Sequence, residues 1–230
     1  MNYGVLLAGG MGTRLGLPTP KQFLKLGEKT LLQHTIEKFV ASSDISFIVV
    51  VVPVAWFEQS LEILNQMNLS NVAICTGGET RQESLYKGLL WLREKFQITD
   101  SDLVVSHDVA RPFVTLNMIR ENIEVCQRFG AADTVVPSAD TIVESKDGLQ
   151  ISSVPVRKNM YLGQTPQTFY VNSFISIYKR LDKDYLDKVT DAAKILRDNG
   201  IHVGLVKGDV SNMKITTLFD LKIAEAVISK

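Results

Sequence analysis

Short apolar runs alternate with longer segments of helical periodicity, and this alternation constrains the fold more than any other feature of the sequence. The runs carry almost no alternating polar residues, as is typical of strands covered on both faces. They lie at Tyr3–Ala8, Ser46–Val52, Val72–Cys75, Leu103–Ser106, Ala132–Pro137 and His202–Lys207. Helices are predicted between and after them at Leu31–Ala41, Trp56–Met67, Thr80–Lys95, Leu116–Phe129, Ser173–Arg180, Asp187–Asn199 and Leu218–Ser229. The pattern predicts an α/β fold: a Rossmann-like, doubly wound, mostly parallel sheet in a single domain over residues 1–230.

Composition excludes several classes of protein. The 230 residues are 45% hydrophobic and 22% charged with zero formal net charge, which disfavours a nucleic-acid partner. The longest apolar stretch, Phe47–Phe57, contains Pro53 and is too short to cross a bilayer, and no basic segment opens the chain. We therefore expect a cytoplasmic protein without a membrane partner, with Cys75 and Cys126 as buried, reduced thiols.

A glycine-rich turn follows the first predicted strand in the string "LLAGGMGTRLGLPTPKQF". Three glycines at 9, 10 and 12 allow close approach of the backbone to a ligand, and Arg14 and Lys21 add positive charge suited to a polyphosphate. The string is neither a Walker loop nor a complete dinucleotide fingerprint. The second strand, in "ISFIVVVVPVAW", also ends without the carboxylate that an NAD site uses for the ribose.

Polar segments follow three further strands, at the edge where α/β sheets bind ligands. They read "TGGETRQES", "SHDVARPF" and "VKGDVSNMKITT". Asp108 directly follows an apolar strand, where a carboxylate can hold Mg²⁺ against phosphates, although a turn or cap role explains it equally well in isolation. Arg111 could pair with Asp108 or bind a second phosphate, and Ser84 could bond a ligand or cap the backbone.

Residues Ala139–Met160 interrupt the α/β rhythm with two β-like runs around Asp147-Gly148, which is hairpin chemistry. We expect a protruding β-hairpin arm that packs on a second copy of the chain. The alternative is a mobile surface excursion.

The residue inventory favours nucleotidyl transfer. The sequence offers neither a Ser/His/Asp triad in a strand-turn setting nor a Cys/His cluster for zinc. A phosphate monoester is already largely dianionic at neutral pH, so its attack on an α-phosphate requires no general base. Lysines, arginines and Mg²⁺ that align the groups and neutralise charge suffice.

The sequence resembles the sugar-phosphate and polyol-phosphate cytidylyltransferases. The matching strings are "LAGGMGTRL" with "PKQF", "GGETRQES", "HDVARPF", "ADTI", "TPQTF" and "NMKIT", in order from residue 6 to 217. The resemblance implies a fold of the nucleotide-diphospho-sugar transferase type, CTP as donor, a polyol phosphate as acceptor, Mg²⁺ as cofactor and a homodimer in which the arm reaches the partner's active site.

The resemblance also implies roles for individual residues. Arg14, Lys21 and Lys214 would be catalytic, the first two at the α-phosphorus, and Asp108 would hold the metal. CTP would be bound by Leu7, Ala8, Gly9, Gly10, Gly12, Thr13, Gly77, Gly78, Arg81 and Ser84. The acceptor would be bound by Asp108, Arg111, Thr141, Arg157, Thr165 and Lys214.

The strings "DTIV", "PVRKNMYLGQTPQ" and "HDVARPF" resemble the ribitol-5-phosphate branch of these enzymes. This resemblance implies D-ribitol 5-phosphate as the acceptor, giving CDP-ribitol for teichoic acid or capsule synthesis. Methylerythritol-type members carry a lysine shortly after the "DT" and an acidic residue before "N-x-K", where this chain has Val143 and Ser211. The ribitol branch implies functional pairing with a ribulose-5-phosphate reductase. The alternatives are 2-C-methyl-D-erythritol 4-phosphate as acceptor, an NAD-dependent oxidoreductase and a catalytically inactive nucleotide-binding module.

Overall fold

A seven-stranded sheet runs through the computed structural model, which describes residues 1–10 and 19–228 of the chain. Parallel pairs join β5 to β4, β4 to β1, β1 to β6 and β7 to β9, whereas β8 runs antiparallel to both β6 and β7. The strands lie in the order β5 (Val72–Thr76), β4 (Phe47–Val52), β1 (Asn2–Leu7), β6 (Leu103–Asp108), β8 (Tyr161–Tyr170), β7 (Gly130–Pro137) and β9 (His202–Lys207).

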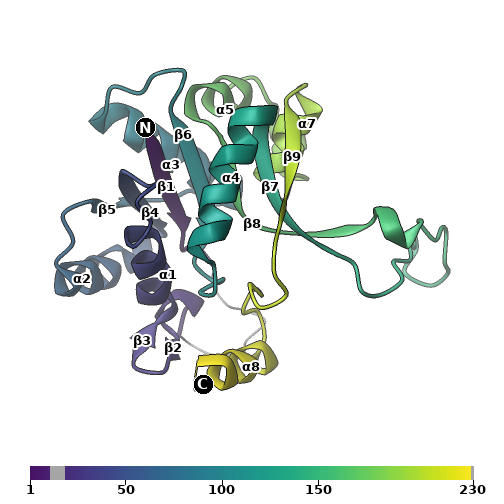
Figure 1. The fold of residues 1–230 in the computed structure, drawn as a ribbon, viewed down its shortest axis with the longest axis horizontal. Coiled ribbons are helices and arrows are strands. Elements are labelled where there is room, and N and C mark those ends of the chain that lie inside the picture. The colour runs from purple at the N-terminus through teal and green to yellow at the C-terminus, as the bar shows by residue number, and fades with distance from the viewer. Residues whose placement is uncertain (11–18, 229–230) are drawn as a thin grey trace.

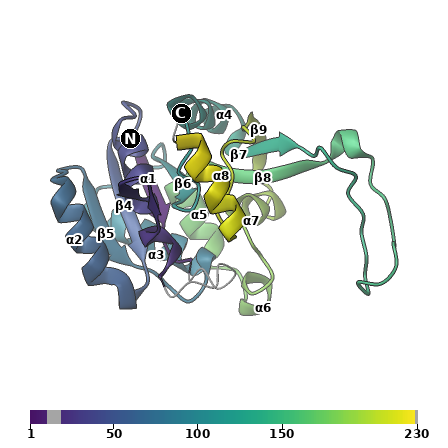
Figure 2. The same cartoon turned by 90° about the horizontal axis from the view of Figure 1, so that it is seen from below.

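Helices cover both faces of this sheet, as the two views in Figures 1 and 2 show. One face packs against α1 (Leu31–Val40), α2 (Phe57–Met67) and α4 (Leu116–Phe129), and α8 (Leu218–Ile228), which contacts β2, adds Ala224 to the same core. The other packs against α3 (Arg81–Lys95), α5 (Val171–Tyr178) and α7 (Ala192–Asp198). Smaller elements are β2 (Lys25–Leu26), β3 (Lys29–Thr30), α6 (Lys183–Leu186) and the 3₁₀ turns η2 (Lys21–Phe23), η3 (Val54–Trp56) and η4 (Arg157–Asn159).

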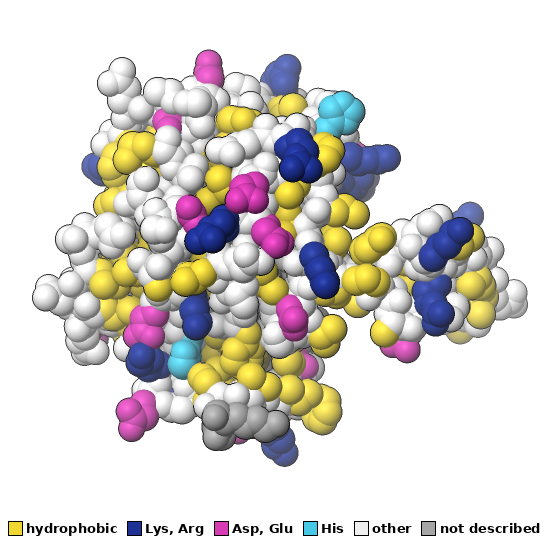
Figure 3. All heavy atoms as spheres, in the orientation of Figure 1, with side chains coloured by type: hydrophobic (Ala, Val, Ile, Leu, Met, Phe, Trp, Pro, Cys, Tyr) yellow, Lys and Arg dark blue, Asp and Glu magenta, His cyan; other side chains and the backbone are white. Residues whose placement is uncertain are grey.

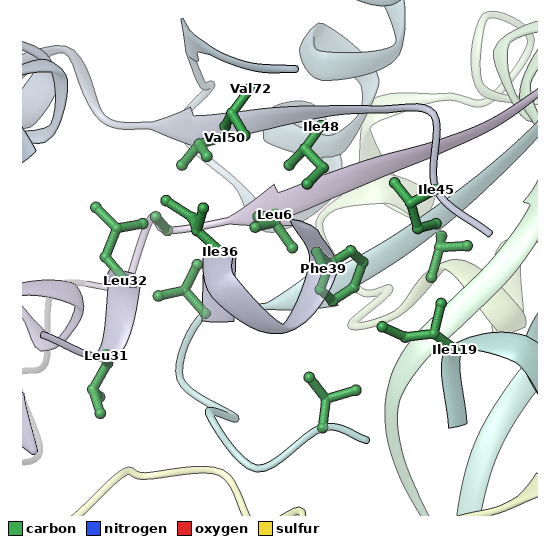
Figure 4. Packing of buried hydrophobic residues seen from close by; sticks show 14 of the residues in the cluster. Leu6, Leu31, Leu32, Ile36, Phe39, Ile45, Ile48, Val50, Val72 and Ile119 are labelled. Atoms are coloured by element: carbon green, nitrogen blue, oxygen red, sulfur yellow. The ribbon is translucent and has the colours of Figure 1, made fainter. Parts of the chain in front are cut away.

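Helix α1 shows how local sequence and packing agree. Thr30 and Gln33 form a capping box at its start, which satisfies backbone amides that have no partner within the helix. Its apolar side chains at helical spacing are fully buried against β1 and β4 (Figure 4). Phe39 lies so close to β1 that a Cβ on Gly4 would be 3.0 Å from its ring.

The sequence predicted the six parallel-type strands and the alternation correctly, and the fold class is confirmed. It missed β8, because the string "YLGQTPQTFY" contains polar residues, a glycine and a proline in place of an apolar run. The helix predicted at Asp187–Asn199 is too long. α6 ends at Leu186, before this range begins, and α7 covers only Ala192–Asp198 behind the N-cap Asp191.

The segment between β7 and β8 projects from the sheet as the predicted arm (Figures 1 and 2). Its tip turns at Gly148, with φ +73°, and Asp147 Oδ1 accepts the amide hydrogens of Leu149 and Gln150. Only one bridge pair outside the named strands, Glu144–Ser153, joins its two sides in the described chain. The chain of the arm therefore goes out and back like a β-hairpin, but its two sides form almost no β-ladder.

Two smaller observations complete the fold. Cys75 and Cys126 are buried free thiols, as expected, and burial raises the pKa of each to about 12. Within residues 1–10 and 19–228, no helix combines the length and apolarity needed to span a membrane.

The close approach of α3 to the sheet depends on Gly88. A Cβ there would lie 2.8 Å from Val51 Cγ2 and 3.3 Å from Val5 Cγ1. Alanine is the better helix former by about 1 kcal/mol, but overpacking a core typically costs about 1–3 kcal/mol. Val51 is β-branched and buried, so it cannot rotate away easily.

We predict that Gly88→Ala lowers the free energy of unfolding by about 1 kcal/mol, measured by chemical denaturation, because overlap outweighs helix propensity. Glu94→Ala, at a side chain that is 70% exposed on the same helix, is the control and should be near neutral. An increase in stability of Gly88→Ala would contradict this account of α3 packing.

Candidate active site

A cavity opens where the strand order reverses. β1 lies between β4 and β6, and ligands of doubly wound sheets bind beyond the carboxyl ends of the strands at such a position. The cavity encloses about 200 Å³ and receives residues from the ends of β1 and β6, from η2, from the start of α3 and from the segment after β9. Its lining is Leu7, Ala8, Gly9, Gly10, Lys21, Gln22, Gly78, Glu79, Thr80, Arg81, Ser84, Asp108, Val109, Ala110 and Lys214.

Asp108 is the charged centre of this cavity. Arg81 donates to its Oδ1 from Nε at 3.0 Å and from Nη2 at 2.9 Å, and Lys214 Nζ donates to Oδ2 at 2.7 Å. Burial would raise the pKa of Asp108, but these two cations outweigh it and hold the pKa well below its usual range. The carboxylate is therefore ionised at neutral pH and is shared by α3 and the segment after β9.

A buried hydrogen-bond chain fixes the end of β6. His107 Nε2 lies 3.0 Å from the carbonyl oxygen of Arg111, so this nitrogen carries the proton and Nδ1 accepts from Thr165 Oγ1 at 2.9 Å. Thr165 Oγ1 in turn accepts the amide hydrogen of Asp108 at 3.1 Å. Burial lowers the pKa of His107 to about 4, so the imidazole is neutral at pH 7 and acts as a structural member of the site.

Arg111 lies beside the cavity and does not form an ion pair with Asp108. Its Nη1 donates to the carbonyl of Asn212 at 2.8 Å, and Nη2 donates to the carbonyl of Gly163 at 3.5 Å. The sequence left two roles open for Arg111: an ion pair with Asp108, or binding of a second phosphate. The predicted ion pair is wrong, because Arg81 pairs with Asp108 instead. Arg111 thus presents charge on the β8 side of the site.

The loop before α3 is held by side chains of the helix that follows it. Ser84 Oγ accepts from the Gly78 amide at 3.0 Å, and Glu83 Oε2 accepts from the Glu79 amide at 2.8 Å. Lys87 Nζ contacts Glu83 Oε1 at 3.0 Å and the Gly77 carbonyl at 3.3 Å. A Cβ on Gly78 would lie 2.2 Å from the Glu83 carboxyl carbon, so only glycine permits this arrangement.

Comparison with known proteins identifies the family. The family described as "IspD: 2-C-methyl-D-erythritol 4-phosphate cytidylyltransferase" matches residues 3–230. The chain belongs to this family. It is therefore an α/β nucleotidyltransferase enzyme with cytidylyltransferase activity.

Solved structures agree with this assignment. The enzyme is 29% identical to the 2-C-methyl-D-erythritol 4-phosphate cytidylyltransferase of Francisella tularensis, with a TM-score of 0.82 and coverage of 98% of each chain. It is 30% identical to the corresponding protein of Thermus thermophilus, with a TM-score of 0.76 and coverage of 100% of each chain. It is 26% identical to the 4-diphosphocytidyl-2C-methyl-D-erythritol synthase of Anaerococcus prevotii, with a TM-score of 0.83. That match covers 100% of this chain and 96% of the Anaerococcus chain.

Most of the catalytic and binding residues predicted from the sequence lie together in the structure of the cytidylyltransferase. Those lining the cavity are Leu7, Ala8, Gly9, Gly10, Lys21, Gly78, Arg81, Ser84, Asp108 and Lys214. Three more lie at its margin: Gly77 beside Ser84, Thr165 against Asp108, and Arg111. Thr141 and Arg157 lie on the arm, which projects away from the sheet (Figures 1 and 2). Gly12, Thr13 and Arg14 lie outside the described residues.

Sequence reasoning missed several residues that shape the site. Glu83 and Lys87 are four residues apart on α3, which is the spacing of a helical ion pair and was a usable signal. Gln22 lines the cavity next to Lys21 in η2. Asn212 donates to the Thr165 carbonyl at 2.9 Å, a contact between segments that no local pattern indicates.

Asp108 is also the residue that could hold a divalent metal. The described chain contains no cluster of three or more His, Cys, Asp or Glu side chains suited to metal binding. Mg²⁺ is usually bound by one or two carboxylates together with water and substrate phosphates, so a single ionised carboxylate in a cavity lined by lysines and arginine fits it. The chemistry of the donor set therefore suits a metal that arrives with a nucleotide.

We predict that replacing two threonines of β8 by valine has different effects on the free energy of unfolding. Thr165→Val would leave the Asp108 amide and His107 Nδ1 without partners and should lower the free energy of unfolding by about 1–3 kcal/mol. Thr168→Val is the matched control, because Thr168 is fully buried and its Oγ1 has no partner in the described structure. Chemical denaturation should show no loss for Thr168→Val. Equal losses for both variants would contradict the network.

Proposed function

We propose that this cytidylyltransferase transfers CMP from CTP to an acyclic polyol phosphate and releases pyrophosphate. The observation that carries the proposal is the cluster of Arg81, Lys214 and Lys21 around Asp108 in one cavity at the strand ends. Two of these cations are already held by the carboxylate, so they are oriented before substrate arrives. Preorganised charge of this kind stabilises the charge that develops on transferring phosphoryl groups.

The proposed step needs no protein nucleophile. An oxygen of the acceptor phosphate forms a bond to the α-phosphorus of CTP, and the bond between that phosphorus and the bridging oxygen to the β-phosphate breaks. Pyrophosphate leaves with the electron pair, and no proton has to move. Lys21 is positioned for phosphate contact by its place beside the β1 end, where a Cβ on Gly10 would lie 3.7 Å from Lys21 Cδ. Arg14 is proposed to share this role.

The remaining roles are proposed on the same basis. Mg²⁺ bound at Asp108 would supply charge neutralisation for the triphosphate. The Gly77–Gly78 loop and Ser84 would bind the cytidine, and the backbone of Leu7, Ala8, Gly9, Gly10, Gly12 and Thr13 would bind the triphosphate. Arg111 and Thr165, next to Lys214, would bind the acceptor phosphate.

Two acceptors are supported by different observations. The family match and the neighbouring structures favour 2-C-methyl-D-erythritol 4-phosphate over ribitol 5-phosphate. Ribitol 5-phosphate is the second candidate, because Val143 and Ser211 stand where the methylerythritol-type pattern has a lysine and an acidic residue. Ribitol 5-phosphate has a linear five-carbon chain, whereas 2-C-methyl-D-erythritol 4-phosphate has a four-carbon chain with a methyl branch and one free hydroxyl fewer. Acceptor choice is therefore a question of how the polyol chain is recognised.

The test is pyrophosphate release from nucleoside triphosphates with a panel of polyol phosphates and Mg²⁺. We predict turnover with CTP, poor turnover with ATP or GTP because backbone groups of the loop held by Ser84 and Glu83 would bind the pyrimidine, and a clear preference for one of the two five-carbon acceptors. Asp108→Ala should lose activity by roughly 10²-fold or more. Equal turnover with purine triphosphates, or with no acceptor present, would contradict the proposal.

We further propose that the active form is a homodimer in which the arm supplies Thr141 and Arg157 to the partner's acceptor site. The arm exposes Leu149, Ile151, Val154 and Val156 at 56–89%, which is unfavourable for a segment in water. Figure 3 shows apolar and basic side chains gathered on it. A two-fold dimer would cover this apolar surface and bring a further cation to each site.

Mixing two variants tests this arrangement. Arg157→Ala and Lys21→Ala should each be nearly inactive alone, because each lacks one charge contact to phosphate. Their mixture should regain about a quarter of wild-type activity after subunit exchange, since half of the dimers would contain one intact site. Absence of recovery despite exchange verified by native mass spectrometry, or full activity of a monomer, would contradict a shared site.

A further inference from the structure

A row of polar side chains crosses the sheet next to Asp108. Ser106 on β6 pairs with Gln167 on β8, and Gln167 pairs with Asp133 on β7. Directly opposite residues of antiparallel strands point to the same face, so the three side chains form one row. Asp108 is two residues beyond Ser106 and therefore lies on the same face, nearer the cavity.

Both polar atoms of the Gln167 side chain have hydrogen-bond partners. Its Nε2 donates to Asp133 Oδ1 at 2.9 Å, and its Oε1 accepts the amide hydrogen of Ala192, at the start of α7, at 3.3 Å. Asp133 Oδ2, by contrast, receives no hydrogen bond from the described part of the chain. Asp133 is half-buried, so this oxygen is still open to a donor from outside the chain, such as water or a ligand hydroxyl.

That oxygen lies beside the residues that surround Arg111. A Cβ on Gly163 would be 3.9 Å from Asp133 Oδ2, and the Gly163 carbonyl accepts from Arg111. The Asp133 carboxyl is close enough to Arg81 and Arg111 that both lower its pKa, but burial and the nearby Asp191 raise the pKa to about 6. The free oxygen is therefore next to the place proposed for the acceptor phosphate.

Other buried polar atoms on β6 and α3 also have no partner in the described part of the chain. Ser106 Oγ, in the row itself, has no partner and Ser106 is fully buried. Both polar atoms of the Gln82 amide are unpaired, and Gln82, next to Arg81, is 1% exposed. Buried polar atoms normally have partners, so the Ser106 hydroxyl is a point in the row that water or a ligand can complete.

We propose that Asp133 is a specificity-determining residue of the acceptor site, accepting a hydrogen bond through Oδ2 from a hydroxyl of the polyol chain. This inference rests on the proposed function. A carboxylate gains a charge-assisted bond from a hydroxyl and is left unpaired by an analogue that lacks it. Asp133 therefore selects a more fully hydroxylated acceptor and disfavours a methyl group at that position.

Asp133→Asn is the discriminating variant, because Asn keeps an oxygen for Gln167 Nε2 and removes the charge. We expect the KM for the preferred acceptor to rise about tenfold or more with the KM for CTP unchanged. Ribitol 5-phosphate should lose more than 2-C-methyl-D-erythritol 4-phosphate. Asp187→Asn, at an exposed aspartate, is the matched control and should leave both KM values unchanged.

A second arm uses only the wild-type enzyme and singly deoxygenated ribitol 5-phosphates. The wild-type enzyme should turn over one of these analogues much more slowly than ribitol 5-phosphate. In Asp133→Asn the difference in turnover between that analogue and ribitol 5-phosphate should be much smaller. Unchanged acceptor KM values and retained discrimination in Asp133→Asn, or an equal rise in the KM for CTP, would overturn the role of Asp133 alone. If none of the acceptors in the panel makes the wild-type enzyme release pyrophosphate from CTP, the proposed function and this inference are overturned together.

Discussion

The ion pairs of Asp108 are the interaction on which the rest of the site depends. A buried carboxylate is stable as an anion only when cations compensate its lost hydration, and here Arg81 and Lys214 provide that compensation from α3 and from the segment after β9. The same contacts fix three elements around one cavity. In the proposed function, an incoming polyphosphate would meet cations that are already oriented, which is the electrostatic condition for nucleotidyl transfer.

The two sides of the cavity are built differently. The proposed nucleotide side would consist of the β1 end and the loop before α3, where Glu83, Ser84 and Lys87 hold the backbone of Gly77–Glu79. The proposed acceptor side would be assembled from β7, β8, the segment before α8 and, in the proposed dimer, a partner's arm. On this proposal, residues of the acceptor side could change without disturbing the contacts that hold Gly77–Glu79.

Much of this arrangement was predictable from sequence, for a physical reason. Parallel strands covered on both faces appear as apolar runs, and polar residues directly after them must meet at one sheet edge, so Lys21, Asp108 and Lys214 were found. β8 was missed because its ladder partners compensate for poor strand residues such as Gly163. The pairing of Asp108 with Arg81 rather than Arg111 depends on tertiary geometry. Asp133 lies inside a predicted strand, where the apolar pattern around it concealed a polar role.

The central claim is that an acceptor phosphate oxygen attacks the α-phosphorus of CTP. The most direct measurement uses acceptor whose phosphate is labelled with ¹⁸O, followed by mass spectrometry of the products. The account predicts that every labelled oxygen remains in the CDP-polyol and that the pyrophosphate is unlabelled. Label in pyrophosphate, or formation of CMP and unchanged acceptor, would contradict the claim and indicate a different reaction at this cavity.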